Sequence, residues 1–378
     1  MNIAILGHGT VGGGVCEIAG KLDGIEVKRI LELRETGGIF TDRFEDIESD
    51  PEIELVAETM GGLHPAYEFA KRSLEAGKHF VTSNKLLVSV YGPELTGIAR
   101  QNGKAFLFDA ACAGGIPYLS SMETARDTDQ IAAFGGILNG TTNFILDAMQ
   151  NGGMTYASAL AEAQRLGYAE RDPSSDVDGL DTMRKLVLCC AVGFGAVLPV
   201  DSIPVAGISK VIPADIEWAA AHGGMLKLCA FGKKTPGGIA AYVEPAVADN
   251  ASPLANVRGS LNYAWYEAEY AGHMGFVGAG AGRYPTASDV IRDIVSVPAG
   301  RRYMTGEDLR DALPDNAGES HPYYLRVPAG TDVPASLIAS KTKKDGYAFI
   351  ETVKVSVTEM HEKFAAREDV FFAGIQKG

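Results

Sequence analysis

Apolar and polar positions follow two different periods along the first 110 residues of the chain. Short apolar runs predict buried strands at residues 2–6, 25–31, 54–58, 79–82 and 105–108. Between two of these runs, residues 65–76 carry the 3.6-residue period of an amphipathic helix. Strands that alternate with helices in this way indicate an α/β fold built on a doubly wound parallel sheet.

The first apolar run leads into a glycine motif that indicates a dinucleotide site. The motif reads Gly-His-Gly-Thr-Val-Gly, with a strand before it and a helix after it. Glycines at this spacing permit a tight turn and let backbone amides approach a pyrophosphate at the helix N-terminus. This Rossmann-type pattern predicts that the cofactor is bound by Gly7, His8, Gly9, Thr10, Val11 and Gly12.

Two charged residues compete to select the dinucleotide. Glu32 lies about 20 residues after the motif, where an acid that binds the ribose 2′-hydroxyl of NAD belongs. Arg34 could instead hold the 2′-phosphate of NADP. We favour NAD over NADP from this pattern. Thr59 and Lys85 follow two further strands, at the carboxyl edge of the sheet where such folds bind ligands.

A second concentration of charge lies between two helical patterns in the middle of the chain. One predicted helix, residues 156–166, ends at Gly167, and the next begins near Gly179. On the second helix Asp181 and Lys185 are four residues apart, so they share one face.

A loop carboxylate, Glu170, could join this pair. Together the three groups would suit a substrate with an ammonium group and an oxygen that exchanges a proton. The alternative is an acidic, solvated loop beside one weak surface ion pair.

Composition narrows the classes of partner. A chain of 378 residues is long for one core, and a formal charge of −14 argues against nucleic acid or an anionic membrane as a partner. Five scattered cysteines without a C-x-x-C motif are typical of reduced thiols, so we expect a cytoplasmic protein. The sequence shows neither a zinc-type ligand cluster nor a signal peptide, and its longest apolar stretch falls short of a membrane span.

Several blocks together carry a resemblance to a known family. They are residues 7–12, 82–85, 109–117, 136–146, 167–185 and 278–288. On these blocks the chain resembles the homoserine dehydrogenases, which implies NAD(P)-dependent hydride transfer between L-homoserine and L-aspartate 4-semialdehyde.

The resemblance also implies a division into domains. A dinucleotide-binding domain is expected at residues 1–118, completed by a helix near 284–297. An α+β substrate and dimerisation domain would follow at 119–300, and a short ACT-like segment at 301–378.

The resemblance assigns roles to individual residues. Lys185 corresponds to the proton-transferring lysine and Lys85 to a second active-site lysine, while Glu170, Asp176 and Asp181 would bind the substrate. Gly167 and Gly280 would join the cofactor site. A monovalent cation, Na⁺ or K⁺, would bind the main-chain carbonyls of Asp109, Cys112, Gly114 and Ile116, although the family usually has Glu and Val at the first two positions.

The C-terminal segment is read as a degenerate remnant of a regulatory domain. We expect a strand at residues 323–327, a helix at 335–341 and a strand at 348–357. Ala335 replaces the glycine of the family's effector turn, so feedback by L-threonine is not expected. The two strands would leave exposed edges, which predicts a homodimer or larger assembly.

Two alternatives to this function stay open. One is a related dehydrogenase of another amino or hydroxy acid, and the other is a catalytically idle NAD(P)-binding sensor. Each would use a small molecule as its ligand.

Overall fold

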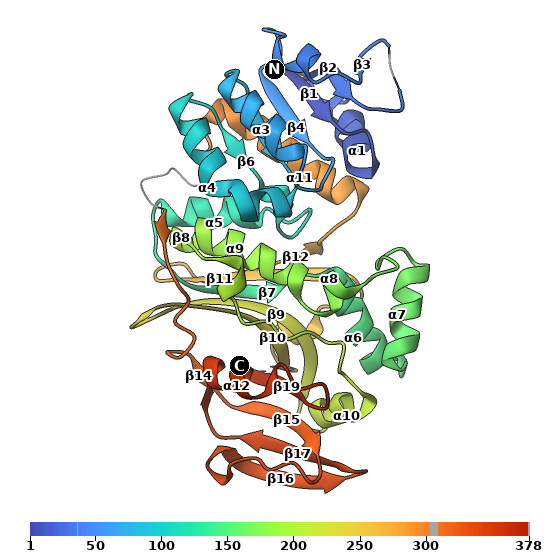
Figure 1. Cartoon of the computed structure of the whole chain (residues 1–378), viewed down its shortest axis with the longest axis vertical. Helices are drawn as coiled ribbons and strands as arrows, with labels where there is room; N and C mark the ends of the chain where they lie inside the picture. The colour runs from blue at the N-terminus through green and yellow to red at the C-terminus, as the bar shows by residue number, and fades with distance from the viewer. Residues whose placement is uncertain (36, 303–308, 377–378) are drawn as a thin grey trace. The chain divides into compact units, whose positions relative to one another are not determined.

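The structure is a computed structural model that describes residues 1–35, 37–302 and 309–376 (Figure 1). The chain forms two compact units. Unit 1 consists of Met1–Ile131, Val187–Val197 and Gly278–Asp311. Unit 2 consists of Ala132–Leu186, Leu198–Val277 and Ala312–Gly378.

Unit 1 is built on a parallel sheet of the predicted doubly wound type. Its strand order is β3-β2-β1-β4-β5-β6. The strands are β1 Asn2–Leu6, β2 Glu26–Leu31, β3 Phe40–Thr41, β4 Leu55–Glu58, β5 His79–Thr82 and β6 Phe106–Leu107. Residues 3–6 and 55–57 are fully buried, which explains the continuous apolar runs of the sequence, since helices cover both faces of such a sheet.

The helices of unit 1 come from the beginning and from a late part of the chain. They are α1 Thr10–Ala19, α2 Glu45–Glu48, α3 Ala66–Glu75, α4 Lys85–Gln101, α5 Tyr118–Arg126 and α11 Arg283–Ser296. A short ladder joins β8 Ala196–Val197 to β13 Arg310–Asp311. Helix α11 lies along α1 (Figure 1). A side chain on Gly14 would lie 2.9 Å from Cβ of Ala287, so this close approach requires glycine.

Unit 2 is built on a nine-stranded mixed sheet. Its order is β12-β11-β7-β9-β10-β19-β15-β17-β16. The strands are β7 Ile131–Ile137, β9 Gly224–Thr235, β10 Gly238–Asp249, β11 Leu261–Ala268, β12 Gly272–Ala279, β15 Tyr323–Pro328, β16 Ile338–Lys344, β17 Tyr347–Thr352 and β19 Phe371–Gln376; β14 Ser320–His321 pairs with β18 Val355–Ser356. The other helices are α6 Gly140–Gly152, α7 Tyr156–Arg165, α8 Ser174–Val177, α10 Pro213–Ala221 and α12 Val357–Phe364. Helix α9, Leu180–Phe194, has its residues 180–186 in unit 2 and its residues 187–194 in unit 1.

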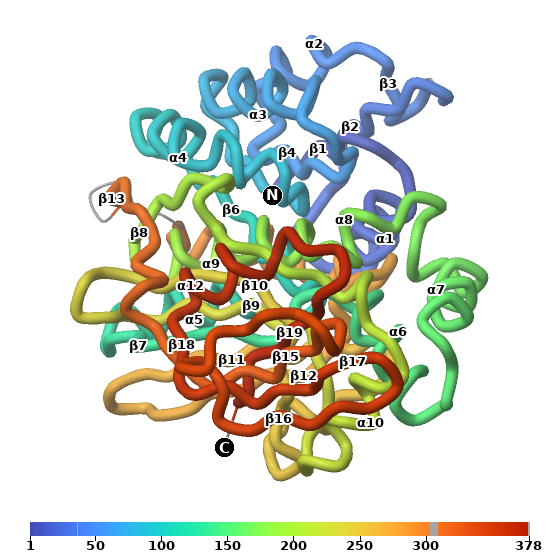
Figure 2. The backbone as a smooth tube through the Cα atoms, turned by 60° about the horizontal axis from the view of Figure 1, so that its bottom comes forward, coloured from blue at the N-terminus to red at the C-terminus, as the bar shows by residue number. Residues whose placement is uncertain are grey.

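The C-terminal strands extend this sheet and belong to unit 2. β19 pairs with β10 in parallel and with β15 in antiparallel direction, and β17 and β16 follow (Figure 2). The resemblance of this segment to an ACT domain stays a prediction.

The prediction of a helix at residues 335–341 is wrong. A 3₁₀ turn at Ala335–Leu337 leads into β16, which pairs with β17. The two strands join at Asp345 and Gly346, both with positive φ (51° and 80°), which is the Asp-Gly signature of a tight hairpin. The strand expected at 348–357 ends at Thr352. Val355 and Ser356 form the short strand β18, and Ser356 also caps α12 by accepting from the Glu359 amide.

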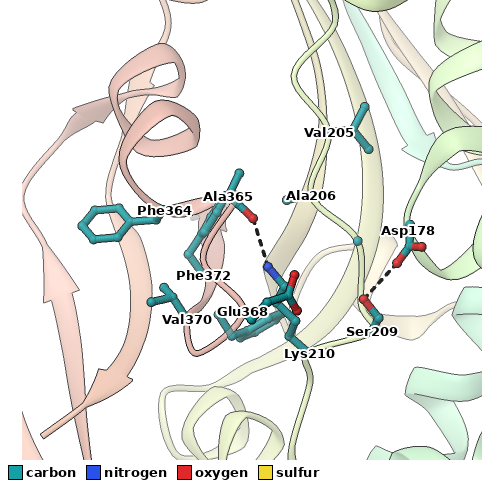
Figure 3. Close-up of a pocket in the computed structure, with 12 residues that line it drawn as sticks. Asp178, Val205, Ala206, Ser209, Lys210, Phe364, Ala365, Glu368, Val370 and Phe372 are labelled. Atoms are coloured by element: carbon teal, nitrogen blue, oxygen red, sulfur yellow. Dashed lines mark hydrogen bonds between the residues drawn. The ribbon is translucent and has the colours of Figure 1, made fainter. Parts of the chain in front are cut away.

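Buried polar contacts tie the C-terminal segment to the rest of unit 2. Glu244 on β10 accepts hydrogen bonds from Nε2 of His321 at 2.9 Å and from Nε2 of His361 at 3.0 Å. Burial alone would raise the pKa of Glu244, but the two histidines outweigh burial and hold this pKa below its ordinary value. Lys210 donates to the Ala365 carbonyl beside a cavity of about 420 Å³ (Figure 3). Lys210 also donates to the Arg367 carbonyl, at 2.9 Å.

None of the helices in the described residues is both long and apolar enough to cross a bilayer.

His79 on β5 makes unit 1 sensitive to acid. Its Nδ1 accepts from the Ala105 amide at 2.9 Å, and burial together with the charge of Lys104 lowers its pKa to about 4. Between pH 6.5 and 4 the unfolded chain therefore binds a proton that the folded chain does not, so stability falls as the pH falls through this window. We predict that His79→Gln reduces the decrease in melting temperature between pH 7 and pH 5.

The matched control is His222→Gln, which removes an exposed histidine and should leave the decrease as in the wild type. Equal decreases in the wild type and His79→Gln would contradict the role of His79.

Candidate active site

The glycine loop of unit 1 has the geometry of a phosphate site. Gly7 has a φ of 89°, and a side chain on Gly12 would lie 2.0 Å from the Gly7 carbonyl oxygen, so both positions require glycine. Helix α1 begins after Gly9, which supplies no side-chain cap. The first amides of α1 are thus left for an anionic ligand, as in dinucleotide-binding folds.

Thr59 and Glu32 lie on either side of this loop. The Thr59 hydroxyl donates to the carbonyls of Leu6 and Gly7 at 3.0 and 3.1 Å, so it fixes the shape of the loop. The Glu32 carboxylate accepts from the amides of Arg34 and His8 at 3.2 and 3.3 Å, and these bonds lower the pKa of Glu32. Among the described residues, the Arg34 guanidinium forms no hydrogen bond or ion pair.

Glu58 is a buried carboxylate that the sequence predicted only as the last residue of a strand. It accepts from the Thr82 hydroxyl at 2.6 Å and from the amides of Met60 and Gly61 at 2.7 and 2.9 Å. Burial raises the pKa of Glu58 despite these bonds. The sequence feature that could have identified Glu58 is its position directly before the Thr-Met-Gly-Gly turn at residues 59–62. Glu58 thus joins the carboxyl ends of β4 and β5, just before α4 begins at Lys85.

The small-residue loop at 109–117 packs against the loop that carries Gly280. The Gly115 amide donates to the Ala279 carbonyl at 3.0 Å, and a side chain on Gly114 would lie 2.3 Å from the carbonyl carbon of Gly280. Gly114 is therefore explained by packing within unit 1, whatever else the loop binds.

The Asp109 side chain has a structural role in this loop. It accepts from the amides of Leu119 and Ser120 at 2.8 and 3.3 Å, and burial raises its pKa to about 6. The Asp109 carbonyl closes a turn by accepting from the Cys112 amide at 3.0 Å. Within the described chain, no three His, Cys, Asp or Glu side chains are placed to hold a metal ion. A cation held by carbonyls stays a prediction.

In unit 2, a single asparagine joins two of the predicted substrate carboxylates. Asn139 caps α6 by accepting from the Thr142 amide at 2.9 Å. Its amide nitrogen donates to Asp176 at 2.7 Å and to Asp181 at 2.9 Å. From the sequence, Asn139 is only a helix-capping candidate within the block 136–146, and its second role depends on α8 and α9 coming to the same place.

Lys185 completes this cluster. Its ammonium group lies 2.8 Å from Oδ2 of Asp181 and donates to the Leu138 carbonyl at 2.5 Å. The side chains of Lys185 and Asp181 are only 9% and 6% exposed. The alternative of a weak surface ion pair is therefore wrong for this pair.

The structure does not bring Glu170 into the cluster as expected. Glu170 is exposed, its carbonyl accepts from Gln164, and in the described part of the chain its carboxylate has no hydrogen bond or ion pair. Asp176 lies beside Asp181 instead, because Asn139 binds both. Gly167 ends α7 with a φ of 78°, which is sufficient reason for a glycine there.

Comparison with known proteins places this arrangement in a family. The NAD-binding domain of homoserine dehydrogenase matches residues 7–109, and the homoserine dehydrogenase catalytic family matches residues 117–295. The chain is 38% identical over 362 residues to a homoserine dehydrogenase of Pseudomonas aeruginosa, which covers 87% of this chain and 82% of that protein. This chain belongs to the homoserine dehydrogenase family.

Solved homoserine dehydrogenase structures have the same fold. That of Thiobacillus denitrificans superposes with a TM-score of 0.88 at 31% identity and covers 100% of this chain and 98% of its own. A hyperthermophilic archaeal homoserine dehydrogenase in complex with NADPH has a TM-score of 0.67 at 25% identity, over 80% of this chain and 99% of its own. The predicted fold class and family are thereby confirmed.

Lys185 is the residue whose loss should affect chemistry most. We predict that Lys185→Ala lowers kcat by about 10²–10⁴-fold, the usual contribution of a positioned acid or base. Dinucleotide affinity should stay unchanged, because the glycine loop is built from other residues. Stopped-flow turnover and equilibrium binding measure the two effects.

Arg184→Ala is the matched control, since within the described residues the neighbouring Arg184 guanidinium hydrogen-bonds only to the Ser175 hydroxyl, at 3.3 Å. Melting temperatures must accompany the kinetics, because Asp181 loses a buried partner. A well-folded Lys185→Ala enzyme with near-normal kcat would contradict the assignment.

Proposed function

We propose that the protein catalyses the NAD(P)-dependent interconversion of L-homoserine and L-aspartate 4-semialdehyde, a step of threonine, methionine and isoleucine biosynthesis. The observation that carries this proposal is the cluster of buried Asn139, Asp181 and Lys185 with the partly buried Asp176, in a chain of this family. The chain is an oxidoreductase that acts on a CH–OH group, as its family requires.

The cluster supplies the proton chemistry of the reaction. During aldehyde reduction, the Lys185 ammonium donates a proton to the carbonyl oxygen, and during oxidation the amine accepts it. Asp176 and Asp181 bind the ammonium group of the substrate. Glu170, which the family resemblance also assigns to the substrate, lies outside this cluster. These carboxylates favour an amino acid over a plain hydroxy acid, because only the amino acid satisfies them.

The proposed cofactor residues lie in unit 1, apart from Gly167 in unit 2. The amides of Gly9, Thr10 and Val11 would hold the pyrophosphate, and Glu32 the adenosine ribose. When bound, the nicotinamide accepts or supplies the hydride. Lys85, at the start of α4, and Gly280 are proposed as further residues of this site.

A bound Na⁺ or K⁺ ion is a further part of the proposal. The carbonyls of Asp109, Cys112, Gly114 and Ile116 would be its ligands. Support comes from the backbone of this loop, in which Ala113 and Gly114 both have positive φ, at 62° and 59°. Such consecutive residues turn a chain sharply, as a ring of carbonyls around an ion requires.

Assembly and location are proposed from the sequence. A homodimer or larger assembly is expected, in the cytoplasm, with no response to L-threonine. The outermost strand β16 is exposed and carries Lys341, Lys343 and Lys344, which disfavours edge-to-edge pairing there. The prediction of exposed edges for the strands at 323–327 and 348–357 is wrong, because both strands are paired on both sides, so self-association would use another surface.

The central experiment is an absorbance assay of NAD and NADP reduction with L-homoserine and a panel of other hydroxy amino acids. We predict that L-homoserine gives the highest kcat/KM, because the carboxylate cluster suits its ammonium and hydroxyl groups. Turnover with another substrate alone would support a related dehydrogenase. Tight dinucleotide binding without any turnover would support an idle sensor.

Cofactor preference depends on Glu32. We predict that wild-type kcat/KM favours NAD, since an anionic Glu32 beside the His8 amide accepts from the ribose diol and repels a 2′-phosphate. Glu32→Ala should weaken NAD more than NADP, whereas Arg34→Ala should change both equally. If Arg34→Ala weakens NADP selectively and the wild type prefers NADP, this assignment is wrong.

A further inference from the structure

We propose that Arg283, the first residue of α11, binds the pyrophosphate of the dinucleotide together with the N-terminus of α1. This inference rests on the proposed dinucleotide-dependent function. It adds a cationic side chain from a segment that lies outside both the glycine motif and the matched NAD-binding region at residues 7–109.

Arg283 reaches the first turns of α1 because α11 packs directly against that helix. A side-chain carbon on Gly13 would lie 3.6 Å from Nη2 of Arg283 and 3.9 Å from Nε2 of His8. The Arg283 guanidinium and the His8 imidazole therefore border the same space, which stays open because Gly13 has no side chain. His8 belongs to the glycine motif, whereas Arg283 is brought there by the fold.

The guanidinium group is positioned before any ligand binds. Nη2 of Arg283 lies 3.5 Å from the Glu17 carboxylate, and the Tyr284 hydroxyl donates to the same oxygen at 3.0 Å. The guanidinium carbon also lies 5.4 Å from the centre of the Tyr284 ring, within cation–π range. The Arg283 side chain is 47% exposed, so a ligand can reach it.

The chemistry of the spot suits a diphosphate ester. Gly9 provides no side-chain cap, so the first amides of α1 can donate to phosphate oxygens. Arginine presents a planar fork of donors that matches phosphate geometry, and the long contact to Glu17 leaves donors of this fork available. The amides and the guanidinium would then bind the two negative charges of one pyrophosphate.

Calorimetric titration of the full-length protein with NAD, NADP, ADP and adenosine tests this assignment. Arg283→Ala should weaken NAD, NADP and ADP by roughly tenfold each, the typical effect of losing one charge-assisted hydrogen bond, and should leave adenosine unchanged. Arg283→Lys should retain part of the affinity, because it keeps the charge without the fork.

Lys21→Ala is the matched control. Lys21 also pairs with Glu17, at 2.9 Å, but it lies just beyond the C-terminal end of α1, so its loss removes an equal charge from a place remote from the glycine loop. This variant should change every affinity by less than about twofold if the effect of Arg283 is direct.

Three results would overturn the inference. If Arg283→Ala binds all four ligands like the wild type, Arg283 only pins α11 to α1. If it weakens NADP alone, Arg283 contacts the 2′-phosphate. If it weakens adenosine as much as ADP, the loss is a general distortion of unit 1. A wild-type protein that binds no dinucleotide would instead refute the proposed function itself.

Discussion

The candidate site depends on one side-chain amide that holds two carboxylates in place, the buried Asp181 and the partly buried Asp176. Asn139 uses its oxygen to cap α6 and its nitrogen to bind Asp176 and Asp181. Two carboxylates at such short range repel each other, and burial increases the cost of their charges. The amide donor and the Lys185 ammonium offset this cost. The position of Lys185, the proposed proton-transferring residue, therefore depends on a helix cap.

The same coupling of local structure to chemistry recurs in unit 1. The tight turn at Gly7 and Gly12 leaves the first amides of α1 uncapped, and Thr59 fixes that turn through the carbonyls of Leu6 and Gly7. Glu58 joins the ends of two neighbouring strands by accepting bonds from the Met60 amide after β4 and from the hydroxyl of Thr82, the last residue of β5. Rigid strand ends thus hold the ligand-binding loops, which is the general arrangement of parallel α/β sheets.

Buried charges in unit 2 show how polar contacts secure the late part of the chain. Glu244 stays anionic because two histidines from the C-terminal segment donate to it, and Asp215 is paired with Arg326 at 2.8 Å. A buried charge that loses its partner is strongly destabilising. The segment after residue 312 is therefore an integral part of unit 2, and its strands complete the sheet that begins with β7 and β9.

Local patterns in the sequence determined most of the secondary structure, the glycine loop and the Asp181–Lys185 pair of the site. The apolar runs predicted the parallel strands, the glycine spacing predicted the phosphate loop, and the four-residue interval predicted the Asp181–Lys185 pair. Each of these signals arises from residues that are neighbours in the chain, so periodicity and spacing are sufficient. The turn at Asp345 and Gly346 could also be predicted from neighbouring residues. The polar residues of β16 did not indicate a strand by themselves, because β16 is defined by its pairing with β17.

Tertiary structure alone decided which groups meet. Asn139 binds carboxylates about 40 residues away, Glu58 bonds to Thr82, and Arg283 reaches a glycine at the other end of the chain. Conversely, Glu170 lies only 11 residues before Asp181 and yet remains outside the cluster. The sequence determined the inventory of reactive side chains and the elements that carry them. Their partners depend on how those elements pack, which no spacing along the chain encodes.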